Sequence, residues 1–161
     1  MTVLRWTNQH IRPHPFGTDV VDDHVWSIVR RGYGSSDQQA DVFTTLLTYA
    51  GVPAYWILIG PERPRIPISL VLVSGEWRVF DVERGIAFRD STGALLAAGA
   101  LERAPEMVRR SASERVGDLD AYLRWFSGFR APGPPEILRA EMQMPAKRLG
   151  YELRRFLRLR T

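Results

Sequence analysis

Cysteine is absent from this sequence of 161 residues. Its absence excludes disulfide bonds, thiolate metal ligands and cysteine nucleophiles for this chain. Histidine is scarce: His10, His14 and His24 show neither His-x-x-x-His spacing nor a histidine–carboxylate cluster. We therefore expect neither a metal site nor another cofactor.

Long hydrophobic runs are also lacking. The longest apolar stretches cover residues 54–60, 68–73 and 93–101, far fewer than the roughly 20 residues of a membrane-spanning helix. The first ten residues contain no apolar segment after a basic start, which is unlike a secretory signal. These features favour a cytoplasmic protein.

The composition is that of a globular protein, with 45% hydrophobic and 25% charged residues. The length suits a single domain over residues 1–161. Residues 1–100 carry 9 basic and 10 acidic groups, a net charge of −1, whereas residues 101–161 carry 13 and 8, a net charge of +5. Nearly all basic residues are arginine. We attribute this to codon bias of a GC-rich, bacterial-type genome and take no nucleic-acid partner from it, because no binding motif accompanies the charge.

The first part of the chain predicts two helices. Residues 1–17 contain Pro13, Pro15 and Gly17 and little periodicity, so we expect an extended lead-in. A helix capped by Asp19 follows and ends at Gly32. Apolar residues at helical spacing predict a second helix over 36–50, ended by Gly51 in a left-handed conformation.

Strand-like runs occupy the middle of the chain, and helical patterns fill the rest. Strands are predicted at 54–60, 66–73 and 76–82, with Ser74-Gly75 as a hairpin turn. Helices are predicted at 95–101, 104–110, 119–129, 135–143 and 146–160. Helices before and after an antiparallel sheet give an α+β fold. Residues 18–90 form its core and residues 91–161 a helical C-terminal extension.

Three segments in this order and spacing resemble the transglutaminase-like superfamily, which has a papain-like fold. Ser36, with Ala40 four residues on and Gly51-Val-Pro-Ala54 fifteen residues on, matches the segment that begins with the family's catalytic cysteine. Gly75-Glu-Trp77 and Phe80-Asp81 match its Gly-x-Trp and apolar-Asp segments. The similarity covers roughly residues 20–90.

The resemblance implies a Cys-His-Asp triad of which this chain retains one member. Ser36 occupies the cysteine position, and counting back from Trp77 places Ile66 at the histidine position. Asp81 stands where the aspartate orients the histidine. A serine hydroxyl without a neighbouring base is a poor nucleophile near neutral pH, so we expect neither cysteine protease nor transglutaminase activity. Rescue by His10, His14 or His24 requires the N-terminal segment to fold over the cleft.

Each candidate residue also has a structural interpretation. Ser36 and Gln39 fit a Ser-x-x-Gln capping box. Asp81 can be a turn residue or the partner of Arg78 or Arg84. Aromatic residues at sheet positions, here Trp56, Trp77 and Phe80, mostly pack in cores.

The sequence therefore predicts a pseudoenzyme: a degenerate transglutaminase-like, non-catalytic domain that binds a peptide, a small molecule or a partner protein, or acts as an accessory subunit. One alternative is an enzyme that reuses the cleft, with Ser36 and either Asp81 or Asp37 in acid–base or hydrolase chemistry. Another is an oligomeric scaffold subunit. The residues expected to line the binding cleft, besides Ser36 and Asp81, are Tyr33, Asp37, Gln38, Trp56, Ile66 and Trp77.

The last predicted helix, residues 146–160, is basic and amphipathic. Leu149, Leu153, Phe156 and Leu157 share one side, and arginines largely surround them. We expect this apolar stripe to dock on the domain and leave the basic side in solvent. The alternative is contact with an anionic membrane surface or an acidic partner.

Overall fold

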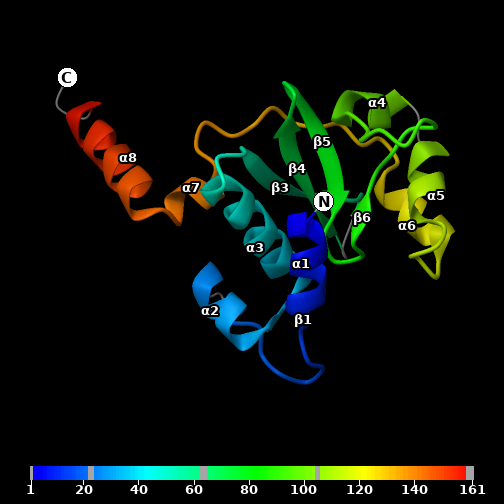
Figure 1. The fold of residues 1–161 in the computed structure, drawn as a ribbon, viewed down its shortest axis with the longest axis horizontal. Coiled ribbons are helices and arrows are strands. Elements are labelled where there is room, and N and C mark those ends of the chain that lie inside the picture. The colour runs from blue at the N-terminus through cyan, green and yellow to red at the C-terminus, as the bar shows by residue number, and fades with distance from the viewer. Residues whose placement is uncertain (1, 22–23, 62–64, 104–105, 159–161) are drawn as a thin grey trace.

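The computed structural model describes residues 2–21, 24–61, 65–103 and 106–158. These form an α+β fold in which helices pack on both faces of an antiparallel sheet (Figure 1). The helices are α1 (Thr2–His10), α2 (Val25–Arg31), α3 (Ser36–Tyr49), α4 (Ala98–Arg103), α5 (Glu106–Ala112), α6 (Leu119–Trp125), α7 (Arg139–Met142) and α8 (Pro145–Arg158). The strands are β1 (Arg12–Pro13), β2 (Tyr33–Gly34), β3 (Ala54–Ile59), β4 (Ile66–Val73), β5 (Glu76–Asp81) and β6 (Ile86–Ala87).

The main sheet has the order β3-β4-β5-β6, and every neighbouring pair is antiparallel. The three predicted strands are confirmed to within a residue at each end. Ser74 and Gly75 join β4 to β5 with φ values of 52° and 80°, and a type I′ two-residue hairpin turn requires such positive values at both positions. β6 is a short fourth strand that the sequence did not reveal.

The two faces of the sheet bury different parts of the chain. Phe80 and Val82 pack with Leu4 of α1 and Phe43 of α3. Val79, the residue before Phe80, faces the opposite cluster with residues of α5 and α6. Figure 1 shows α1 and α3 on one side of the sheet and α5 and α6 on the other. Each side chain of β5 is therefore assigned to one face by its position in the alternation.

Helix α3 confirms the prediction for residues 36–50. Its last turn closes with Gly51 at φ 80° and a hydrogen bond from the Val52 amide to the Leu47 carbonyl. Glycine suits this position because a left-handed residue with a side chain is strained. The helix leads directly into β3, which runs back along it.

Helix α2 ends at Gly32 as predicted, with φ 74° and a hydrogen bond from its amide to the Ile28 carbonyl. The predicted start at Asp19 is wrong, since the helix begins at Val25 and His24 caps it. The tertiary structure explains the difference. The Val21 carbonyl accepts a hydrogen bond from the Gln38 side chain of α3, so it serves a neighbouring helix and not a helical turn of its own.

The expected extended lead-in over residues 1–17 is also wrong, because residues 2–10 form α1. Leu4, Thr7 and Ile11 are buried along one side of this segment, at spacings that fit a helix. The Asn8 side chain further fastens α1 to the end of β5 by donating to the carbonyls of Val82 and Glu83. The prolines follow the helix, where β1 pairs in parallel with β2.

In the C-terminal half, α4, α6 and α7 are shorter than predicted, and α5 ends at Ala112, two residues after the predicted end at residue 110. Residues 95 and 97 form bridges with Arg89 and Arg78, so α4 starts at Ala98 and not at residue 95. Helix α6 ends at Trp125, four residues before the predicted end, and α7 covers only Arg139–Met142. Residues 104–105 and 159–160 of the predicted helices lie outside the described residues.

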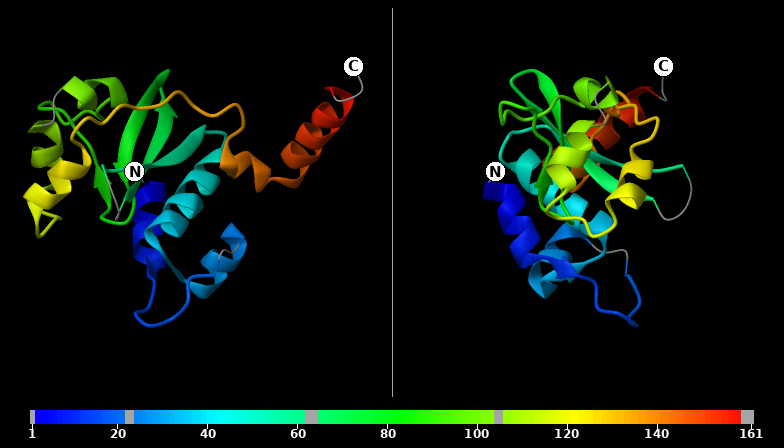
Figure 2. Two further views of the ribbon diagram at one scale, coloured as in Figure 1. Left: turned by 180° about the vertical axis from the view of Figure 1, so that it is seen from behind. Right: turned by 90° about the vertical axis from the view of Figure 1, so that its right-hand side faces the viewer.

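Helix α8 does not dock as expected. It projects from the rest of the molecule in two opposite views (Figures 1 and 2), and Leu149 and Leu153 are 62% and 54% exposed. The expectation that the apolar stripe packs on the domain is wrong for these two residues. The cause is the preceding helix α7, which is held against α3 and directs the chain outward.

Replacing Leu4 with alanine tests the packing of α1. Leu4 is 3% exposed between α3 and the sheet, and truncating a buried leucine costs about 2–5 kcal/mol. We expect Leu4→Ala to lower the free energy of unfolding in urea by an amount in this range, whereas Arg5→Ala, at an exposed position of the same helix, changes it little. A loss below about 1 kcal/mol for Leu4→Ala would show that α1 is not part of the core.

Candidate functional site

Ser36 is the first residue of α3 and is half-buried. The helix cap lies one residue earlier than the predicted Ser36–Gln39 pair. Ser35 is the N-cap, and its amide donates to Gln38 Oε1 at 3.2 Å. The Ser35 hydroxyl donates to the carboxylate of Asp37, which is exposed. Ser36 is therefore not the helix cap; Ser35 has that role.

Gln38 links three segments around the start of α3. It is 5% exposed. Its Oε1 accepts from Arg31 Nη2 at 2.7 Å, and its Nε2 donates to the Val21 carbonyl at 2.6 Å. The side chain of this predicted binding residue is thus occupied in joining the end of α2 and the 18–21 segment to α3.

Asp81 is fully buried on the side of the sheet that faces α6. Its Oδ2 accepts from Tyr122 Oη at 2.8 Å and from Arg84 Nη1 at 3.1 Å, and its Oδ1 accepts from the Arg84 amide at 3.1 Å. A buried carboxylate is stable only when its charge and oxygens are matched in this way. The arginine pairing predicted for Asp81 is present, with Arg84 as the partner; Arg78 bonds Glu76.

Arg84 and Tyr122 are matched to this carboxylate. Burial lowers the pKa of Arg84, but the negative charges of Asp81 and Glu83 together raise it by more, so that the net shift is upward. Burial and the charge of Asp81 raise the pKa of the Tyr122 hydroxyl. The Arg84 guanidinium also lies over the rings of Tyr122 and Trp125. The cluster therefore carries a permanent cation, a neutral phenol and an aspartate.

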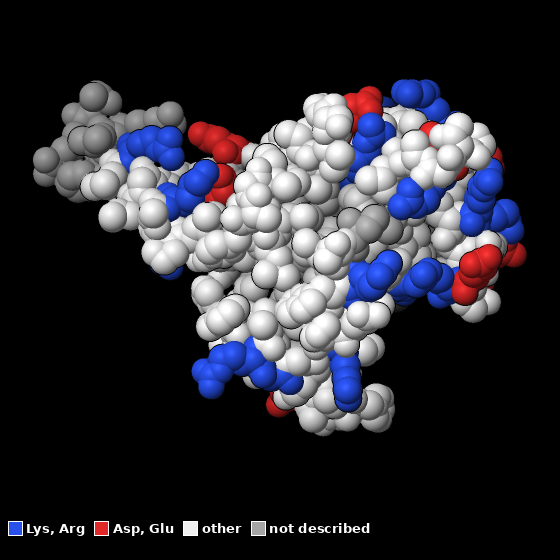
Figure 3. All heavy atoms as spheres, in the orientation of Figure 1, with Lys and Arg blue, Asp and Glu red and all other residues white. Residues whose placement is uncertain are grey.

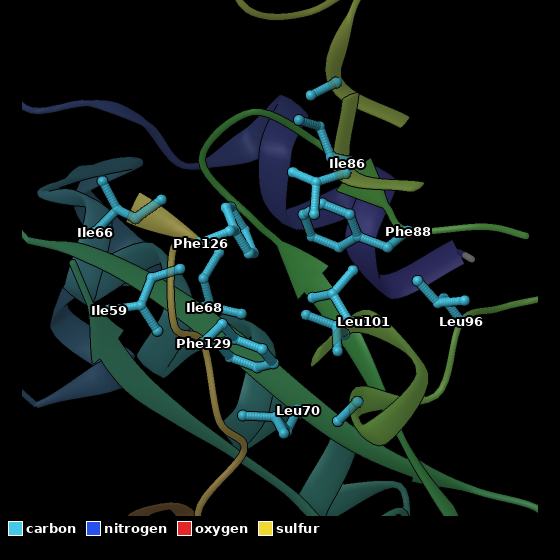
Figure 4. Packing of buried hydrophobic residues seen from close by; sticks show 14 of the residues in the cluster. Ile59, Ile66, Ile68, Leu70, Ile86, Phe88, Leu96, Leu101, Phe126 and Phe129 are labelled. Atoms are coloured by element: carbon cyan, nitrogen blue, oxygen red, sulfur yellow. The ribbon is translucent and has the colours of Figure 1, made fainter. Parts of the chain in front are cut away.

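Ile66 and Trp77 belong to the same side of the sheet as Asp81. Ile66 is 5% exposed and packs in the cluster with Ile68 and Phe126 (Figure 4). Trp77 packs on the edge of this cluster, with its ring edge-to-face against Tyr55 at 4.8 Å between centroids. Both side chains contribute to the core that α4, α5 and α6 cover.

The structure does not bring the three triad positions together. Ser36 starts a helix that packs on the face of Phe80 and Val82, whereas Ile66 and Asp81 contact residues on the opposite face. An acyl-transfer triad needs its nucleophile, base and orienting carboxylate within hydrogen-bonding reach of one another.

Each of the three histidines makes short-range contacts, and His14 also contacts Tyr33 of β2. His10 Nδ1 lies 2.9 Å from the Trp6 carbonyl, and its ring stacks on Trp6. His24 Nδ1 accepts from the Trp26 amide. His14 Nδ1 lies 3.1 Å from the Pro15 carbonyl, and its ring contacts the edge of Tyr33. These contacts give each ring a local structural role.

Trp56, another expected binding residue, is covered by two charged side chains, Asp41 and Arg139. Its Nε1 donates to Asp41 Oδ1 at 2.5 Å, and the Arg139 guanidinium lies over its ring. Arg139 also pairs with Asp41 Oδ2 at 3.0 Å. Since Arg139 starts α7, these contacts fix that helix against α3 and β3. The sequence analysis did not predict the pairing of Asp41 with Trp56 and Arg139, although an aspartate within an apolar helix face was a visible signal.

A pocket of about 470 Å³ opens beside Tyr33. Arg31 lies over the Tyr33 ring and donates through Nε to its carbonyl at 2.9 Å. Arg12 is exposed and is positioned by the bond from its amide to the Gly32 carbonyl. The lining residues are Gln9, His10, Arg12, Pro13, Pro15, Arg31, Gly32 and Tyr33. Two arginines and an aromatic ring thus line the same pocket. Of its lining residues, the sequence analysis had predicted only Tyr33 as a binding residue.

The comparisons with known proteins do not assign the chain to a family. The sequence matches no protein-family model and no curated protein. The fold aligns with a crystal structure described as “a Putative Cysteine Protease from Cytophaga hutchinsonii”, with a TM-score of 0.45 and 15% identity. The alignment covers 60% of this chain and 33% of that chain, so it spans about a third of the other protein. Similarity at this level assigns no function.

Within the part of the chain that the structure describes, no helix has both the length and the apolar character needed to cross a membrane. The same residues contain no group of three histidine or carboxylate side chains arranged to hold a metal ion.

The buried carboxyl of Asp41 predicts a specific pH dependence of stability. Burial raises its pKa above the ordinary 3.8, although Trp56 and Arg139 oppose the shift. The folded state then holds this proton more tightly than the unfolded state, so this group's contribution to the free energy of unfolding falls as pH rises through the interval above 3.8. We expect Asp41→Asn to remove this fall. Its stability relative to the parent should improve between about pH 3.5 and pH 7.

Urea unfolding at both pH values measures the change. Asp120→Asn is the matched control, because Asp120 is exposed and pairs with Arg109 on the surface. If the relative stability of Asp41→Asn instead declines as pH rises, the ion pair with Arg139 outweighs burial and the expected shift has the wrong sign.

Proposed function

We propose that this chain is a degenerate transglutaminase-like domain that performs no acyl transfer and binds an acidic peptide in the pocket beside Tyr33. The observation that carries the first half is the orientation of Asp81. Its side chain is bonded to Tyr122 and Arg84 on the face of the sheet opposite α3. A carboxylate used in this way is unavailable to orient a base near Ser36.

The chemistry of the pocket supports the second half of the proposal. Arg12 and Arg31 give it positive charge, and its lining residues include no carboxylate in the described part of the chain. Guanidinium groups bind carboxylates through two parallel hydrogen bonds. Tyr33, Pro13 and Pro15 provide flat apolar surface for the peptide backbone between its acidic side chains. Arg31 is already held by Tyr33 and Gln38, which reduces the entropy lost on binding.

A reconstructed triad tests the non-catalytic half. We expect Ser36→Cys combined with Ile66→His to show no release of ammonia from a glutamine peptide and no transfer to a primary amine. The new imidazole would lie in the apolar core, on the face away from residue 36. It should also lower the Tm, because burying a polar ring without a partner is unfavourable.

Ser36→Cys alone is the control and should keep the parent's Tm. Turnover by the double variant, absent from the single variant, would show that the two positions face each other and would contradict the proposed arrangement.

Binding of a capped hexaglutamate peptide, measured by isothermal titration calorimetry, tests the second half. We expect binding that weakens with salt, with Arg12→Gln reducing the affinity about fivefold, as for loss of one exposed ion pair of about 1 kcal/mol. Arg30→Gln, at an exposed arginine of α2 that does not line the pocket, should leave the affinity unchanged. Equal weakening by both variants would indicate attraction to overall charge and no specific pocket.

A further inference from the structure

Helix α8 stands apart from the core. It runs from Pro145 to Arg158, and its main neighbour is the short helix α7. The views in Figures 1 and 2 show it projecting from the body of the molecule. Leu149 lies at the rim of a groove with His24 and Met142, yet it remains 62% exposed. The helix therefore presents surface that the described chain does not cover.

The exposed surface of α8 has an apolar side and a basic side. At 3.6 residues per turn, Ala146, Leu149 and Leu153 fall on one side of the helix. The basic residues Lys147, Arg148, Arg154 and Arg155 fall on the other sides and are all exposed. Figure 3 shows Lys and Arg side chains along the part of this projection that is described.

The electrostatics of α8 favour a strongly anionic surface. Residues 145–158 contain five basic residues and one acidic residue, Glu152, which give a net charge of +4. A second copy of the chain is a weak electrostatic match, because residues 1–100 carry a net charge of only −1. The helix has 14 residues and is about 21 Å long at 1.5 Å per residue, too short to cross a bilayer core of about 30 Å.

We propose that α8 is an interfacial anchor that lies flat on a bilayer containing anionic lipid. Leu149 and Leu153 enter the boundary between headgroups and acyl chains. The arginines bind lipid phosphate and carboxylate groups, and their aliphatic stems extend along the membrane surface. This site is separate from the pocket beside Tyr33.

Sedimentation of the full chain with vesicles tests the anchor. The probes are phosphatidylcholine vesicles with and without about one third phosphatidylserine. We expect binding to the anionic vesicles only, weakened by salt. Leu149→Ser with Leu153→Ser should reduce the bound fraction at least about fivefold, because it removes the apolar contact. Leu58→Ser, at a 48% exposed leucine of β3, is the matched control and should bind normally.

The charge contribution is tested in the same way. Arg148→Gln with Arg154→Gln should weaken binding, whereas Arg124→Gln with Arg130→Gln, at exposed positions outside α8, should weaken it less. Circular dichroism shows whether each variant keeps its fold.

Three outcomes would overturn the proposal: equal binding to vesicles without phosphatidylserine, unchanged binding of the double serine variant, or no vesicle binding at all. A dimer in analytical ultracentrifugation that dissociates in the double serine variant, without vesicle binding, would assign α8 to a second copy. Failure of Arg12→Gln to affect peptide binding would leave the anchor intact, because the two surfaces share no residue.

Discussion

The alternation of side chains along β5 is the constraint on which the other features of the sheet depend. Phe80 and Val82 must lie beneath α1 and α3 to complete that core, so Asp81 between them is directed to the opposite face. There a carboxylate is stable only with matched partners, which Tyr122 and Arg84 provide. A shift of one residue would place Asp81 beneath Phe43 and remove two apolar side chains from that core. The register and the position of α6 are thus linked through one residue.

The central elements of the fold were predictable because their sequence signals are local. Alternating and continuous apolar runs located β3, β4 and β5, and Gly51 marked the end of α3. Helix α1 was missed because one of its two buried residues, Thr7, is polar, and its other apolar contacts, from Val3 and Trp6, are only partly buried. The early start predicted for α2 failed because a distant side chain, Gln38, takes the carbonyl of Val21. Such long-range hydrogen bonds leave no periodicity in the sequence.

The site was less predictable than the fold. The apolar run at residues 66–73 located β4, but spacing along the chain does not tell which face of a sheet a helix will cover. The Asp41–Arg139 pair and the pocket of Arg12 and Arg31 join segments far apart in the sequence. Only Tyr33 among the expected binding residues lines that pocket. Local sequence patterns thus located secondary structure, while contacts between distant segments determine the role of each side chain.

The residues of α8 are under different structural constraints from those of the sheet and α3. Residues of the sheet and of α3 are constrained by packing, so a change in one requires compensation in others. The exposed residues of α8 add surface without adding to that core. Substitutions there can accumulate without threatening folding, so the tail can acquire, exchange or lose a target while the scaffold stays constant. In related chains we would expect the greatest divergence in this segment.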